Sequence, residues 1–269
     1  MLGAIIGDMV GSPFKFDVSI KRKDFGPLFT ANSNYSDGTV LTLAMADALS
    51  WMPKDAGIPT IRMEVIRSMR EWGQRYMYAG YEGQFLTWLL EEPPMPYGGD
   101  GNDAAIRIAP AGWLYDTLER TIQVAKAATE ITHNDPQGVK GAVAVAAVIF
   151  LARTGHKKSV IRQYVAQQFG YDLSRTMDQI RETYFPKDSC QETVPEAITA
   201  FLEGQGFEDV IRGAISLGGT SDKLAGIAGS MAEAFYVIPN EMREQALKRM
   251  EDDMREVYQR FCKKKGNHV

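Results

Sequence analysis

The chain has 269 residues, of which 45% are apolar and 24% charged, so it is long enough to bury a sizeable core as one large domain. Its formal charge of -4 excludes the basic balance of a nucleic-acid-binding protein, and its two cysteines, Cys190 and Cys262, exclude a disulfide framework and a cysteine-based zinc site. No secretory signal or membrane span is recognisable, because the N-terminal apolar run is interrupted at Asp8. We expect one cytoplasmic domain over residues 1–269 that binds neither nucleic acid nor membrane.

The first predicted element is a buried helix over residues 1–16 that stops at Pro13. Gly3, Gly7 and Gly11 recur every four residues, which leaves one helix face without side chains, so that a neighbour can pack directly on the backbone. Residues 17–35 are polar and irregular, too long for a simple turn, and are expected to cover a cleft.

Clusters of oxygen-bearing side chains open two predicted helices. Residues 36–39 are Ser-Asp-Gly-Thr, and residues 220–222 are Thr-Ser-Asp after a Gly-Gly turn. Such residues cap the free N–H groups of a first helical turn, which is sufficient to explain either cluster alone. Because both open apolar helices, the two clusters could also converge on one site for a hard cation or for sugar hydroxyls.

The stretch between these clusters is predicted to be mostly helical. Residues 58–90 form an amphipathic helical pattern. Its predicted core-facing side chains are Met63, Ile66, Met69 and Trp72. Residues 93–115 are rich in proline and glycine and predict a loop whose backbone N–H groups could bind a phosphate, although Asp100 and Asp103 would oppose an anion there.

The remaining chain predicts further helices. A helix over residues 118–129 is followed by a loop that carries His133, which either caps the loop or contacts a ligand, and then by a long, buried Ala/Val helix. His156 and His268 are expected at the surface. More helices are predicted over residues 159–170, 195–202, 207–216 and 240–264. Because no segment alternates as a strand does, the fold should be all-α, in a single compact multi-helix domain.

Five ordered segments resemble the ADP-ribosylglycohydrolase family over nearly the whole chain. They are GAIIGDMVGSPFKF, YSDGTVLTLAMADAL, GNDAAIRIAPAGWL, ITHNDPQGVKGA and SLGGTSDKLAGIAGSMAEAFY. The resemblance implies an all-helical fold with a cleft in which two Mg²⁺ or Mn²⁺ ions hold the hydroxyls of the distal ribose, while a glycine loop and a histidine hold the pyrophosphate. In that family a metal-bound water and an acidic residue cleave the bond from ribose C1″ to the modified side chain.

The sequence departs from the family pattern where the chemistry would lie. The family's Thr-Asp-Asp-Thr is residues 36–39 here and lacks one carboxylate, and its Gly-Gly-Asp-Ser-Asp-Thr is residues 218–223, which lacks another and ends in a lysine. Lys15 replaces a glutamate expected after the first helix. The family's Gly-Asn-Gly is Gly101-Asn102-Asp103, and the second histidine of its His-Asn-His-Pro turn is Asp135.

These exchanges make the presumed metal pocket more positive by about five charges, comparable to the charge of two divalent ions. We therefore expect Lys15 and Lys223 to take the place of the metals and to pair with Asp37 and Asp222, which become vestigial catalytic residues, so that no metal cofactor is held. The residues expected to contact a ligand are Ser36, Gly99, Asp100, Gly101, Asn102, Asp103, His133, Thr220 and Ser221.

Three functions remain open from the sequence. The first is a pseudoenzyme that binds an ADP-ribose-like ligand or a partner without divalent metals. The second is an active hydrolase with a rebuilt site that releases ADP-ribose from a modified side chain or small molecule. The third is a purely structural or partner-binding protein, whose partner the sequence does not identify.

Overall fold

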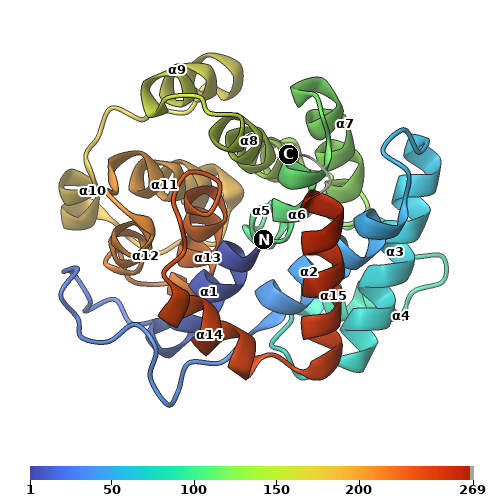
Figure 1. Cartoon of the computed structure of the whole chain (residues 1–269), viewed down its shortest axis with the longest axis horizontal. Helices are drawn as coiled ribbons and strands as arrows, with labels where there is room; N and C mark the ends of the chain where they lie inside the picture. The colour runs from blue at the N-terminus through green and yellow to red at the C-terminus, as the bar shows by residue number, and fades with distance from the viewer. Residues whose placement is uncertain (267–269) are drawn as a thin grey trace.

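The computed structural model describes residues 1–266, and over this range the regular elements are all helices. Figure 1 shows α1, α5 and α13 near the middle of the molecule, with the other helices around them. The all-α prediction is therefore confirmed. The helices are α1 (Leu2–Gly11), the 3-10 helix η1 (Ser12–Phe14), α2 (Asp37–Trp51), α3 (Ile58–Arg75), α4 (Gly83–Leu90), α5 (Asp103–Arg107), α6 (Ala109–Leu114), α7 (Leu118–Thr129), α8 (Pro136–Arg153), α9 (Lys158–Phe169), α10 (Met177–Thr183), α11 (Cys190–Glu203), α12 (Phe207–Ile215), α13 (Ser221–Ala232), α14 (Asn240–Arg249) and α15 (Asp252–Gly266).

Helices α1 and α13 pack backbone to backbone. A Cβ atom on Gly7 would lie 2.1 Å from the carbonyl oxygen of Ala225, and one on Gly11 would lie 2.5 Å from that of Ser221. Both distances are far below van der Waals contact, so only glycine allows this approach. The predicted bare face of the first helix is thus its contact with α13, and it sets the end of α1 against the first turn of α13.

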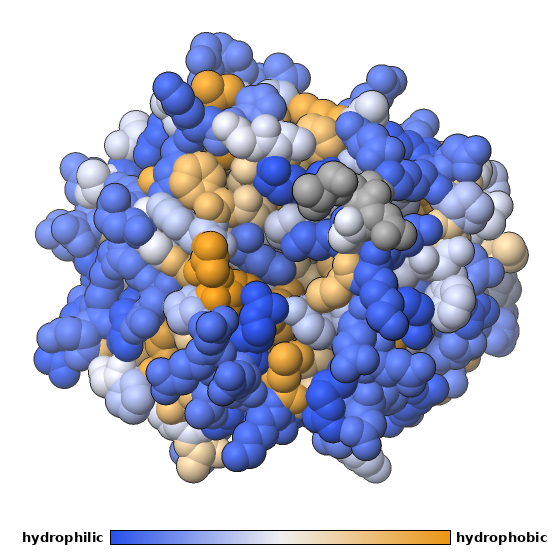
Figure 2. Space-filling model, in the orientation of Figure 1, coloured by the Kyte–Doolittle hydropathy of each residue, from blue (hydrophilic) through white to orange (hydrophobic). Residues whose placement is uncertain are grey.

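The longest apolar helix, α8, is long and apolar enough to cross a membrane, but 72% of it is buried inside the fold. It begins where Asp135 accepts a hydrogen bond from the backbone N–H of Gln137 (2.7 Å), followed by Pro136 in the first turn. Burial of this kind is typical of the core helix of a globular domain. On the face shown in Figure 2, hydrophilic residues dominate, with scattered apolar patches between them.

Two sequence predictions about the first half of the chain were wrong. Met69 and Trp72 are buried as predicted and Ile66 is partly buried, but Met63 is 61% exposed, because Ile61 and Val65 complete the core face of α3. Residues 93–115 are a loop only in their first part. From residue 103 onwards the chain forms α5 and α6, since alanines favour helix and a proline is well placed in the first turn of α6.

Helix boundaries were also harder to predict than helix positions. The stretch 58–90 breaks into α3 and α4 around Gly80, whose φ is 95°, and the stretch 240–264 breaks into α14 and α15. The short helix α10 was not predicted. His156 is partly exposed, and His268 lies outside the described residues. Residues 17–35 are irregular as predicted and loop out beside α12, where Lys23 Nζ lies 2.9 Å from Asp209.

Candidate functional site

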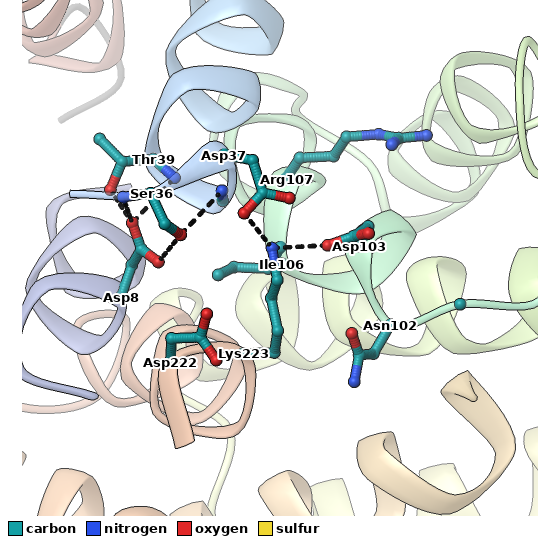
Figure 3. Close-up of polar contacts among 12 residues, drawn as sticks. Asp8, Ser36, Asp37, Thr39, Asn102, Asp103, Ile106, Arg107, Asp222 and Lys223 are labelled. Atoms are coloured by element: carbon teal, nitrogen blue, oxygen red, sulfur yellow. Dashed lines mark hydrogen bonds and ion pairs between the residues drawn. The ribbon is translucent and has the colours of Figure 1, made fainter. Parts of the chain in front are cut away.

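Four buried carboxylates meet where the first turns of α2, α5 and α13 face α1 (Figure 3). Three of them stand in the first turn of a helix, where the positive end of the helix dipole stabilises negative charge. The fourth belongs to α1. The group consists of Asp8, Asp37, Asp103 and Asp222. The two oxygen-rich clusters, residues 36–39 and 220–222, therefore lie close together. This agrees with the interpretation that they converge on one site.

Lys223 lies in the middle of this group and is 5% exposed. Its Nζ is 2.7 Å from Asp37 Oδ1 and 2.6 Å from Asp103 Oδ1, so one ammonium group joins α13 to both α2 and α5 (Figure 3). Burial lowers the pKa of Lys223, but the carboxylates of Asp103 and Asp37 outweigh it and raise this pKa well above the ordinary lysine value. Lys223 is therefore a permanent cation, and a protonated amine has no lone pair for a metal.

Lys15 supplies a second cation at the rim of the group. Its Nζ lies 3.0 Å from Asp222 Oδ2, with the lysine side chain 29% exposed and Asp222 fully buried. Burial lowers the pKa of Lys15, but the charge of Asp222 outweighs this effect, so the pKa lies above that of a free lysine. The two lysines thus contact the two carboxylates considered in the sequence, and Asp103 is an additional partner of Lys223.

Asp8 was treated in the sequence only as an interruption of an apolar run, yet it anchors the start of α2. Its carboxylate accepts hydrogen bonds from Ser36 N (2.8 Å), Thr39 N (3.1 Å), Thr39 Oγ1 (2.5 Å) and the Ser36 hydroxyl. Burial raises the pKa of Asp8, while Lys223 and these hydroxyl donors oppose that rise. Gly38 stands where the family pattern has an acidic residue. A Cβ atom on Gly38 would lie 2.7 Å from Ile106 Cδ1, so an apolar side chain occupies the space that this residue would need.

Asp37 and Asp103 hold the same ammonium but differ in their surroundings. Burial raises the pKa of Asp37 to about 7. Burial acts on Asp103 in the same direction, but Lys223, together with His133 and Arg107, lowers its pKa to about 2. Because the two carboxyls share one cation, their titrations are linked, and the pair takes up a proton near neutral pH. We place that proton on Asp37, because His133 and Arg107 are among the strongest influences that lower the pKa of Asp103 but are not among the strongest on the pKa of Asp37.

His133 lies behind the glycine loop. It is buried, and its Nδ1 is 3.0 Å from Thr132 Oγ1 and 3.3 Å from the Arg107 guanidinium. Burial lowers the pKa of His133 to about 3, so the imidazole is neutral. On its other side, a Cβ atom on Gly99 would lie 3.1 Å from Nε2. Nδ1 of His133 therefore packs against Thr132 and Arg107, whereas Nε2 faces the loop at Gly99.

The loop itself is partly tied to other segments. The backbone N–H of Asn102 donates to the Asp188 carbonyl (2.7 Å), and its side chain donates to Thr193 Oγ1 (3.1 Å). The backbone N–H of Gly98 donates to Asn134 Oδ1 (2.8 Å). These N–H groups are not available to a phosphate. Asp100 is exposed, and Gly101 pairs with Ser189 through an isolated bridge.

Arg107 was not singled out in the sequence. It is fully buried, donates to Thr132 Oγ1 (2.5 Å), and keeps Nε and Nη1 without a partner in residues 1–266. Burial lowers the pKa of Arg107, but a guanidinium stays protonated in proteins. Its spacing of four residues from Asp103, on one helix face, was the available signal.

Several oxygens at the start of α13 are buried without a hydrogen bond. They are Thr220 Oγ1, Ser221 Oγ and both carboxylate oxygens of Asp222, whose ion-pair partner is Lys15. Within the described part of the chain, no group of three or more His, Cys, Asp or Glu side chains is arranged to hold a metal ion. The donor set does not fit the family's two divalent ions, because an ammonium group already lies between Asp37 and Asp103.

Comparisons with known proteins agree with this geometry at the level of the family. The ADP-ribosylglycohydrolase family model matches residues 1–267. An uncharacterised protein of Archaeoglobus fulgidus is 27% identical over 157 residues, covering 52% of each chain. ADP-ribosylhydrolase ARH3 of Gallus gallus is 25% identical over 184 residues, covering 52% of this chain and 50% of that protein. The matches span about half the length of these curated relatives.

A solved structure shares the fold over the whole chain. It is described as an ADP-ribosylglycohydrolase-related protein complex, is 21% identical, and superposes with a TM-score of 0.66 over 98% of this chain and 95% of its own. At this identity the likeness concerns the fold alone. The arrangement of helices is thus shared with a solved structure.

Proposed function

Because the chain belongs to the ADP-ribosylglycohydrolase family, we propose that it is a non-hydrolytic member in which two lysine ammonium groups replace the divalent metals, and that it binds an ADP-ribose-like ligand without them. The observation that carries this proposal is the Lys223 amine, 2.7 Å from Asp37 and 2.6 Å from Asp103. No other described group offers those carboxylates a comparable partner.

The charge of Lys223 opposes metal binding in two ways. A divalent ion would have to displace an ammonium that is stabilised by two buried carboxylates, and it would then lie beside that positive charge. The carboxylate that the family pattern has at position 38 is absent, and Ile106 fills the space beside it. Without a metal-bound water, activation of the nucleophile and orientation of the ribose are both lost, which removes several kcal/mol of transition-state stabilisation.

The unpaired oxygens of the site support ligand binding. The Thr220 and Ser221 hydroxyls are buried without hydrogen bonds, and Asp222 has only the Lys15 ammonium as a partner; buried polar groups of this kind gain free energy when a partner is supplied. The hydroxyl groups of a ribose are suitable partners, because each can donate to a carboxylate and accept from a hydroxyl or an ammonium. Lys15, at the rim, would contact the same ligand.

A thermal-shift measurement with ADP-ribose in EDTA, and again with Mg²⁺, tests the proposal. We expect ADP-ribose to raise Tm equally in both conditions, since the cations of the site are part of the chain. A rise that requires Mg²⁺, with release of ADP-ribose from modified arginine or serine peptides, would identify an active hydrolase instead. No shift in either condition would favour a structural or partner-binding protein.

A further inference from the structure

Phe16 combines a strained backbone with an exposed ring. Among residues 1–266 it is the one non-glycine residue in the left-handed region, with φ at 68°, and its side chain is 74% exposed. A side chain in this conformation costs free energy that glycine would not. Because the ring is mostly in solvent, burial offsets little of that cost. Strain of this kind clusters at active sites and at segments that clamp ligands.

Hydrogen bonds hold Phe16 at the start of α13. Its backbone N–H donates to the Gly219 carbonyl (2.7 Å), and the N–H of Gly219 donates to the Asp17 carbonyl (3.1 Å). The Lys15 ammonium lies close to both groups, 5.4 Å from the centre of the Phe16 ring and 3.0 Å from Asp222 Oδ2. The ring therefore stands at the same rim as the unpaired oxygens of the proposed ligand site.

The chain near the same glycine pair carries two further exposed apolar residues. A Cβ atom on Gly219 would lie 2.4 Å from Pro186 Cβ, and the preceding residue, Phe185, is 77% exposed but lines a separate pocket with Arg175 and Tyr184. Val18, 55% exposed, packs its backbone against Gly218. A single exposed apolar side chain is ordinary, so it is the position of the Phe16 ring beside Lys15, and not its exposure alone, that indicates a ligand contact.

We infer that Phe16 is a stacking platform for a planar aromatic group carried on the anomeric carbon of the bound ribose. This inference rests on the proposed function, which places the ribose hydroxyls on Thr220, Ser221 and Asp222. A group attached to the anomeric carbon of that ribose, directed away from Thr220, Ser221 and Asp222, would extend past Lys15 to the Phe16 ring. The favoured ligand is then an N-glycoside with a planar base on that ribose, and free ADP-ribose is the weaker form. Stacking of a base on an aromatic side chain corresponds to roughly tenfold or more in affinity.

The test compares ADP-ribose with NAD⁺, which differ by a nicotinamide ring on that carbon. Calorimetric titration in EDTA should show the wild type binding NAD⁺ about tenfold more tightly than ADP-ribose. Phe16→Gly should abolish this preference, leave the affinity for ADP-ribose unchanged, and raise Tm because the strain is relieved. Phe16→Trp should keep the preference. Tyr78→Ala, which removes a fully exposed ring elsewhere, is the matched control and should change none of these values.

The outcomes separate this inference from the proposal beneath it. If ADP-ribose binds but NAD⁺ is not favoured, or if Phe16→Gly keeps the preference, the stacking role is wrong and the ligand site stands. A lower Tm for Phe16→Gly would show that the ring is structural and would overturn the inference. If neither nucleotide binds the wild type, the proposed function fails and the inference fails with it.

Discussion

At the scale of single residues, the two lysines of the site have different roles. Lys223 is buried between two carboxylates, whereas Lys15 reaches a single carboxylate from the rim. Removal of one partner from a buried ion pair leaves uncompensated charge in the interior, whereas a partly exposed pair contributes little. Lys223 is therefore part of the folded core. Lys15, which is partly exposed, remains accessible to a ligand.

Lys223→Met should lower the free energy of unfolding at pH 7 by about 3–5 kcal/mol, because Asp37 and Asp103 would face each other without a cation. Lys15→Met, the matched control, should cost about 1 kcal/mol or less. Urea denaturation of both variants measures the difference. Equal losses in the two variants would show that the buried ammonium does not hold the helices together.

The raised pKa of Asp37, about 7, predicts a pH dependence of stability. Between about pH 4 and 7 the folded chain holds a proton that the unfolded chain has released, so stability should fall as pH rises through this window, by up to about 1.4 kcal/mol per unit. Asp37→Asn should flatten that slope. Asp209→Asn is the control, because burial raises the pKa of Asp209 but hydrogen bonds from Lys23 and the Gln205 backbone outweigh it, so that the pKa is lowered and its effect is confined to more acidic pH. An unchanged slope in Asp37→Asn would place the proton elsewhere.

At the scale of helices, the site depends on the close approach of α1 and α13. The glycines of α1 let the two backbones touch, and this contact positions the first turn of α13, with Asp222 and Lys223, against Asp8. The four carboxylates come together because three helices begin at the same place. The packing of α1 and α13 therefore determines the geometry of the cation cluster.

Gly7→Ala should destabilise the protein by about 1–3 kcal/mol, because its Cβ would lie 2.1 Å from the carbonyl oxygen of Ala225 and the helices would have to separate. Gly83→Ala, in α4, meets no atom within 4 Å and should be neutral or slightly stabilising. Thermal unfolding of the two variants provides the comparison. A neutral Gly7→Ala would contradict the backbone contact.

Local patterns in the sequence were sufficient for most helices and for the bare face of α1. They did not give the phase of α3, where Met63 is exposed, because propensity does not tell which face meets the core. They also missed Arg107 and the anchoring role of Asp8, since both depend on segments far away in the chain. The pairing of Lys223 with Asp103 was not predicted, because Asp103 is the first residue of α5 and the sequence predicted a loop there from its prolines and glycines.

At the scale of the whole molecule, the family fold is retained while its centre has changed. The fold needs its buried carboxylates neutralised, and here Lys15, Lys223 and Arg107 supply positive charge from within the chain. Under the proposed function, such an arrangement would remove the dependence of the folded state on added ions. It would also keep the helix ends in place for a ligand, without the chemistry of a metal-bound water.

Titration of the wild type with Mn²⁺ in a calorimeter tests the central claim most directly. We expect no saturable binding, because Lys223 already holds Asp37 and Asp103. Lys15→Glu, Gly38→Asp, Thr220→Asp and Lys223→Thr together, with Ile106→Val to make room, should create stoichiometric binding, and the same variant with Lys223 kept should not. Tight, stoichiometric Mn²⁺ binding by the wild type would contradict the replacement of metals by lysines.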